Sequence, residues 1–132
     1  MIAQYIELGD RGWSILVYYN INQGDFEEVE DSLRQFGCPT EDIEDIYETL
    51  RNKNTGFTVS DERKRMSIIG IGTASSRAQF LNTLIHEIDH VQSHICDYYN
   101  VDMNSEQAAY LIGYIGQQTY KAVSTFIKHG RL

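Results

Sequence analysis

Apolar residues after Ser76 recur every three or four positions, and this spacing constrains the fold more than any other feature of the sequence. The repeating positions are Phe80, Leu84, Ile88, Val91 and Ile95. Ser76 and Gln79 have the spacing of a capping box, in which each side chain binds the other residue's backbone amide, and Asn100 can end a helix in the left-handed conformation. The pattern therefore predicts a long amphipathic helix over residues 76–99 and a second helix over about residues 104–128.

In the first half of the chain, residue types and the spacing of apolar residues predict strands and two short helices. Residues 13–21 are β-branched and aromatic between turn residues, which is typical of a buried strand. Residues 57–60 and 66–71 predict a hairpin joined by a charged turn. Helical spacing of apolar residues predicts helices over residues 25–36 and 40–52, with Asp25 and Thr40 as their caps and Gly37 ending the first.

Length and charge narrow the possible functions. A chain of 132 residues can bury one core, so we expect a single domain over residues 1–132. The net charge of −8 would repel a phosphate backbone, which argues against nucleic acid as a partner. No run of apolar residues is long enough for a membrane span, and the first residues lack the features of an export signal. Cys38 and Cys96 are too few and too far apart for a disulfide framework or a cysteine zinc site, so we expect a reducing, cytoplasmic location.

Negative charge is concentrated in the two short predicted helices. Between Asp25 and Glu48 there are ten carboxylates and one basic residue, Arg34. A solvated face on amphipathic helices explains this distribution most simply. The alternative is a docking surface for a basic partner.

The pentapeptide His86-Glu87-Ile88-Asp89-His90, an H-E-x-x-H motif, gives the clearest chemical signal. Residues four apart share a helix face, so both imidazoles can bind one Zn²⁺ at about 2.0–2.1 Å. Glu87 lies about 100° further round the helix, where it can take a proton from a metal-activated water. These are the elements of peptide hydrolysis. A pair of surface histidines that bind no metal is the alternative.

With this motif the chain resembles the zincin metallopeptidases. A catalytic zinc has three protein ligands and one open position. The metzincin pattern would place glycine and histidine where this chain has Ser93 and Cys96, so Cys96 is expected in the core. His94 is about 12 Å along the helix from His86, too far to share one ion, and is expected at the rim of the site.

A glutamate from the following helix is the third ligand in gluzincins, and Glu106 stands in that part of the chain. The run from Glu106 through Tyr110 to Tyr114 resembles small gluzincin-type proteins of phages and bacterial mobile elements. The resemblance implies His86, His90 and Glu106 as zinc ligands, with Asp102 in reserve. Pairing with the helix dipole is the alternative role for Glu106.

The resemblance also implies a fold and assigns roles to further residues. It implies a compact α+β fold of minigluzincin type, with a small twisted sheet packed on the motif helix. Residues 66–71 resemble the zincin edge strand, which holds an extended peptide. Tyr110 stands where thermolysin-like enzymes have an aspartate, so it either supports the catalytic chemistry with its phenol or packs in the core.

Two functions follow from these observations. The first is a zinc-dependent peptidase that cleaves a protein or peptide substrate, with Glu87 as general base. The second is a zincin-fold structural or assembly protein, for example a phage virion component, whose metal site is structural or vestigial.

Overall fold

The computed structural model describes residues 1–129, with side chains described as far as residue 125. Within these residues, four strands form one mixed sheet in the order β1-β2-β4-β3. The strands are β1 (Ile2–Glu7), β2 (Ser14–Ile21), β3 (Gly56–Asp61) and β4 (Met66–Gly72). The central pair, β2 and β4, is parallel, and the two outer pairs are antiparallel.

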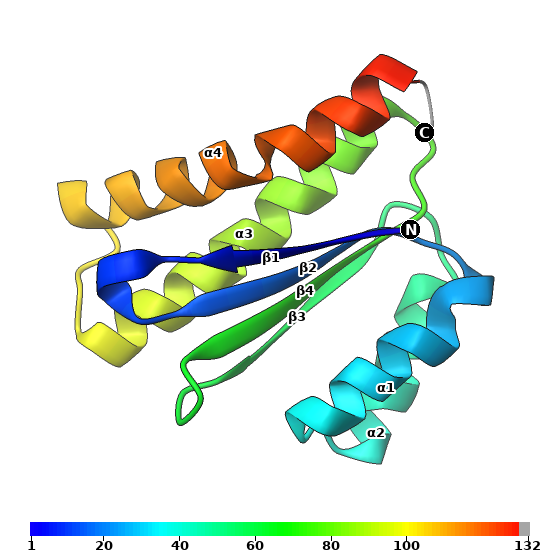
Figure 1. Ribbon diagram of the computed structural model, residues 1–132, viewed down its shortest axis with the longest axis horizontal. Helices are drawn as coiled ribbons and strands as arrows, with labels where there is room; N and C mark the ends of the chain where they lie inside the picture. Colours follow the sequence, from blue (N-terminus) through cyan, green and yellow to red (C-terminus); the bar gives the residue numbers. More distant parts are fainter. Residues whose placement is uncertain (130–132) are drawn as a thin grey trace.

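Helices cover both faces of the sheet (Figure 1). They are α1 (Phe26–Phe36), α2 (Thr40–Leu50), α3 (Arg77–Tyr99) and α4 (Glu106–His129), with single 3-10 turns at η1 (Gly9–Arg11) and η2 (Gln23–Asp25). The first two helices lie on one face, and α3 and α4 lie on the other. The predicted α+β class is therefore confirmed, as an open sheet between two pairs of helices.

The core consists of two hydrophobic clusters, one on each side of the sheet. Along β2, Ile15 and Val17 pack toward α3 and α4, whereas Leu16 and Tyr18 pack toward α1 and α2. A strand that is covered on both faces needs apolar residues at nearly every position. This explains why the β2 sequence is almost continuously apolar. The predicted stripe of α3, from Phe80 to Ile95, is buried as expected.

The sequence patterns did not predict β1. Its buried residue Ile6 alternates with exposed Tyr5 and Glu7, which is the period of a strand with one covered face. Six residues with such weak alternation of apolar and polar side chains are too few to predict a strand. Pairing with β2 supplies the hydrogen bonds that keep the segment extended.

Most of the predicted helix ends are confirmed. The Ser76 hydroxyl accepts a hydrogen bond from the Gln79 amide at 3.1 Å, and Gly37 and Asn100 take the left-handed conformation at φ 98° and 56°. Asp25 takes the predicted cap position of α1, but its side chain does not cap this helix. Its carboxylate instead accepts from the backbone amide of Asn22, because the chain makes a 3-10 turn before α1 begins.

The second predicted cap, at Thr40, is wrong by one position. Thr40 is the first residue of α2, and Pro39 takes the cap position with an extended backbone. Proline lacks a backbone N–H and has its φ fixed, so it fits at the start of a helix.

Neither long helix within the described residues is apolar enough to span a membrane.

Candidate metal site

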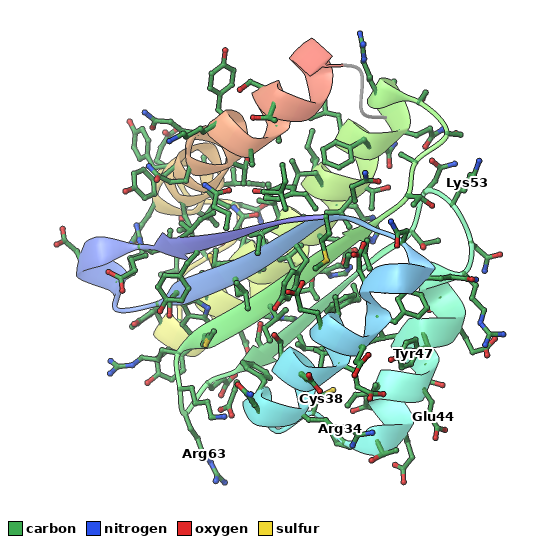
Figure 2. All side chains as sticks on the ribbon, turned by 45° about the vertical axis from the view of Figure 1, so that its right-hand side comes forward. Arg34, Cys38, Glu44, Tyr47, Lys53 and Arg63 are labelled. Carbon is green, nitrogen blue, oxygen red and sulfur yellow. The ribbon has the colours of Figure 1, made fainter. Side chains whose placement is uncertain are left out.

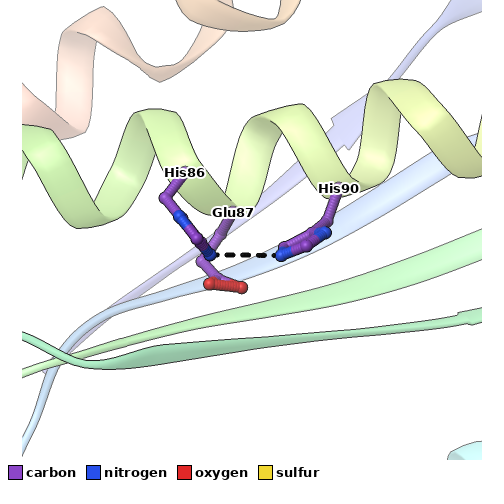
Figure 3. A group of neighbouring side chains, drawn as sticks. All are labelled: His86, Glu87 and His90. Carbon is purple, nitrogen blue, oxygen red and sulfur yellow. Dashed lines mark hydrogen bonds between the residues drawn. The ribbon is translucent and has the colours of Figure 1, made fainter.

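His86 and His90 lie one turn apart on α3, and their rings converge (Figure 3). Their Nε2 atoms are 3.2 Å apart, and the ring planes meet at 78°. Two nitrogens that bind one tetrahedral zinc at about 2.05 Å would stand about 3.3 Å apart. The 3.2 Å contact is a hydrogen bond between the two rings, and the same spacing is close to what two ligands of a single cation require. Both side chains are exposed and accessible from solvent.

Glu87 joins the two histidines from the side of α3 that faces the sheet. The potential ligand atoms of His86, Glu87 and His90 all lie within 4.8 Å of one another. In contrast to the histidines, Glu87 is only 4% exposed. Its carboxylate Oε1 accepts a hydrogen bond from the Thr58 hydroxyl at 3.0 Å, which compensates part of the cost of burying a charge.

Strand β3 meets this part of α3 with small side chains. Gly56, Thr58 and Ser60 alternate along β3 on the side that faces α3, whereas Phe57 and Val59 pack on the opposite side. A Cβ atom at Gly56 would lie 3.0 Å from Cγ of Glu87 and 2.7 Å from a backbone oxygen of β4. The absence of a side chain at this position lets the buried glutamate fit between the helix and the strand.

Thr83 is a buried polar residue beside the site. It lies about one turn before His86 and Glu87 on α3, and its side chain is 6% exposed. Its methyl group lies 3.0 Å from the position that a Cβ of Gly56 would occupy, so it packs beside Glu87 against β3. The edge of the sheet therefore covers this part of α3.

His94 begins a chain of hydrogen bonds that leads into the core. Its Nδ1 is 2.7 Å from the Ser60 hydroxyl, which is 2.7 Å from the Ser67 hydroxyl, and Ser67 accepts from the Trp13 indole at 3.0 Å. Burial lowers the pKa of His94 below its usual value, and the charge of nearby His90 lowers it further, while Glu62 and Asp97 oppose the shift. His94 is thus anchored to β3 beside the site, and it is not a member of the converging group.

The structure does not bring Glu106 or Asp102 into this group. Gln92 faces α4, where its amide donates to the backbone oxygen of Ala108 at 2.7 Å. At 100° per residue, Gln92 lies about 200° round the helix from His90. The start of α4 therefore packs against the side of α3 that is turned away from the histidines, and Figure 3 shows the three side chains of the site extending from one side of α3.

Each of these two carboxylates has a local environment of its own. Glu106 is exposed in the first turn of α4, where its charge interacts favourably with the helix dipole. Asp102 accepts a hydrogen bond from the Asn104 amide in the preceding loop. The ligand role of Glu106, with Asp102 in reserve, stays a prediction.

Tyr110 also lies apart from the histidines. It is 73% exposed and lines a shallow groove with Leu8 and Arg11 beside α4. Core packing, one of its two predicted roles, is excluded by this exposure. Its predicted catalytic role is untested, and the structure does not place it near Glu87. Cys96 is buried in the core, as expected.

The edge strand beside the site is β3, and the prediction that residues 66–71 form the edge is wrong. β4 pairs with β2 on one side and with β3 on the other, so its backbone groups are already bonded. β3 pairs only with β4 among the described strands, and it contacts α3 at Glu87 and His94. The strand that follows the hairpin turn enters the centre of the sheet because β2 offers it a parallel partner.

Sequence reasoning did not identify Thr58 and Ser60 as part of the site. The available signal was the run Gly56-Phe-Thr-Val-Ser60, in which small or hydroxyl residues alternate with apolar ones. That pattern indicates a strand with two unlike faces, but it does not say which element the polar face will meet.

Comparison with protein-family models, with curated proteins and with solved structures found no match. On α3, two exposed histidines and one buried glutamate converge in a group that could hold a metal ion.

Proposed function

We propose that this chain is a metal-dependent peptidase in which His86 and His90 hold a divalent cation, zinc being the expected ion, and Glu87 is the general base. The observation that carries the proposal is the 3.2 Å separation of the two Nε2 atoms with the Glu87 carboxylate beside them. Imidazole nitrogens are common ligands of zinc. A bound cation would lower the pKa of a coordinated water toward about 7 and polarise a substrate carbonyl.

Glu87 supplies the proton chemistry in this proposal. Its carboxylate would accept a proton from the attacking water as the C–O bond forms, and would then return it to the amide nitrogen, after which the peptide C–N bond breaks and the amine leaves. The proton stays within reach of one carboxylate throughout. Burial beside Thr58 keeps this carboxylate in one orientation, which a proton shuttle requires.

The substrate in this proposal is a protein or peptide. The free edge of β3 runs beside Glu87, and such an edge offers unpaired backbone groups to an extended chain. Two histidine ligands are one fewer than catalytic zinc sites usually have. Glu106 remains the proposed third ligand, and this role would require the first turn of α4 to approach the opposite side of α3.

Assembly through the acidic helices is the alternative proposal. Carboxylates of α1 and α2 line the face of the molecule opposite α3, where Arg34 and Glu44 are labelled in Figure 2. Arg34 pairs with Glu30 at 3.7 Å, which neutralises little of the charge of these helices. A basic partner would therefore bind away from the histidine pair.

Metal analysis of single variants tests the proposed site. We expect His86→Ala and His90→Ala to lose zinc, because each removes one of two converging nitrogens. Glu87→Gln should retain zinc and the fold but lose any hydrolysis of a cleavable protein partner. Loss of zinc from Glu106→Ala, with Asp102→Ala unaffected, would support the predicted third ligand.

Two results would contradict the proposal. Zinc content that is unchanged in both histidine variants would show that the metal binds elsewhere. A Glu87→Gln variant with wild-type hydrolytic activity would remove the general base. Zinc binding without hydrolysis of any natural partner would favour the assembly protein.

A further inference from the structure

Glu87 is close enough to the two histidines to become a metal ligand itself, and its hydrogen bond with Thr58 affects whether it acts as a ligand or as a base. The Glu87 carboxylate lies within 4.8 Å of the histidine nitrogens, a short distance for a flexible side chain. Carboxylate oxygens bind zinc at about 2.0–2.2 Å. A cation held by two imidazoles would therefore attract Glu87 as a further ligand. A carboxylate bound in this way could no longer accept a proton freely.

The Thr58 hydroxyl opposes this movement. A hydroxyl has one proton to donate. The Oγ1 atom of Thr58 lies 3.0 Å from Oε1 of Glu87 and 3.3 Å from the backbone oxygen of Glu87. The carboxylate is both the nearer and the charged acceptor, so it receives the stronger hydrogen bond. Thr58 projects from β3, the strand that packs against this part of α3, and its hydroxyl contacts Glu87 from that strand.

Packing reinforces the same orientation. The Cγ atom of Glu87 and the methyl group of Thr83 each lie 3.0 Å from the position that a Cβ atom at Gly56 would take, so the glutamate stem packs closely against β3. With its stem enclosed, the carboxylate can reach the cation mainly by rotating its terminal group. The hydrogen bond from Thr58 restrains this rotation directly.

We propose that Thr58 is a positioning residue, whose hydroxyl holds the Glu87 carboxylate off the metal so that Glu87 serves as a base and not as a ligand. This inference rests on the proposed function, because it requires a cation at His86 and His90. It adds a residue of β3 to the site and assigns its hydroxyl a specific task.

Co²⁺ binding measures this task without any substrate, because the visible spectrum of Co²⁺ changes with the number and type of its ligands. We expect the wild type and Glu87→Gln to bind Co²⁺ with the same affinity and the same spectrum. Thr58→Val has nearly the same shape but lacks the hydroxyl. It should bind Co²⁺ about tenfold more tightly, the lower end of the range in which partners of metal ligands usually act, and with an altered spectrum.

Two further variants separate positioning from a general structural effect. Thr58→Ser keeps the hydroxyl and should behave as the wild type does. The double variant Thr58→Val/Glu87→Gln should return to the wild-type affinity and spectrum, because the released group is no longer a carboxylate. Circular dichroism checks the fold of each variant, and Thr58→Ala replaces Thr58→Val if valine disturbs the strand.

The outcomes distinguish failure of this inference from failure of the proposed function. An unchanged affinity and spectrum in Thr58→Val would overturn the inference, as would weaker Co²⁺ binding by Glu87→Gln alone, since Glu87 would then already be a ligand. If wild-type Co²⁺ binding is absent, or survives His86→Ala, the proposed site itself is wrong and the inference falls with it.

Discussion

His94 shows how one residue on the polar side of α3 acquires a structural partner. The motif places it two turns beyond His86, and its ring nitrogen is bonded to Ser60. The Trp13 indole can only donate a hydrogen bond, so the Ser67 hydroxyl accepts it and can donate its own hydrogen bond to Ser60. In that arrangement the Ser60 hydroxyl donates to Nδ1, and the ring is neutral with its proton on Nε2.

The lowered pKa of His94 predicts a pH dependence of stability. The unfolded chain takes up a proton near pH 6.5, whereas burial, and then the charge of His90, lower the pKa of His94 in the folded protein. The contribution of neutral His94 to the free energy of unfolding is therefore complete above about pH 6.5 and decreases as the pH falls below that value. Urea unfolding in the presence of a chelator, at several pH values from 8 to 5, measures it.

His94→Gln is the control for this prediction. Glutamine can still meet Ser60 but does not titrate, so the variant should lose less unfolding free energy between pH 8 and 5. An equal loss in the wild type and the variant would show that other groups, and not His94, cause the acid sensitivity.

At the level of helices and strands, the hairpin of β3 and β4 depends on the glycine at position 70, which has no side chain. Gly70 of β4 lies beside Phe57 of β3, and a Cβ atom at Gly70 would stand 2.0 Å from the Phe57 ring. Phe57 is buried against the cluster under α1 and α2. The ring cannot withdraw without disturbing that cluster. The close approach therefore links the hairpin to the helices on the far face of the sheet.

Gly70→Ala should lower the free energy of unfolding by about 1–3 kcal/mol, because the added methyl group overpacks the hairpin. Gly113→Ala in α4 is the matched control, since no side chain and no backbone from outside its own stretch of helix lies within 4 Å of the added Cβ, its two chain neighbours apart. It should raise stability by about 1 kcal/mol through helix propensity. Chemical denaturation of both variants measures the difference, and a Gly70→Ala variant as stable as the wild type would contradict this account.

Considered as a whole, the molecule buries its core without help from the metal site. One hydrophobic cluster lies under α3 and α4, and the other lies under α1 and α2. The two histidines stand outside both clusters, on the exposed side of α3. Within the described residues, every buried polar side-chain atom has a hydrogen-bond partner in the protein.

The apo protein should therefore remain folded after exhaustive chelation. Its melting temperature should fall by a few degrees, because a ligand that binds only the native state stabilises it by mass action. Circular dichroism and thermal melts before and after chelation test this expectation. Loss of most of the helical signal would instead indicate a structural site whose binding energy is folding energy, which would favour the assembly protein.

Local features could be predicted from the order of residues along the chain. The ends of α3 follow from Ser76 and Asn100, and the convergence of His86 and His90 follows from their four-residue spacing. These features depend on backbone geometry within a few residues, so the identity of nearby residues is sufficient to determine them.

The remaining features depend on contacts between distant segments. The hairpin was predictable from residues 57–71, but its position in the sheet depends on β2, so the edge strand was assigned to the wrong segment. Thr58 contacts Glu87 because β3 packs on α3, and Glu106 lies apart because α4 packs on the other side of that helix. Sequence spacing cannot specify such positions, because burial of the two apolar clusters decides which faces meet.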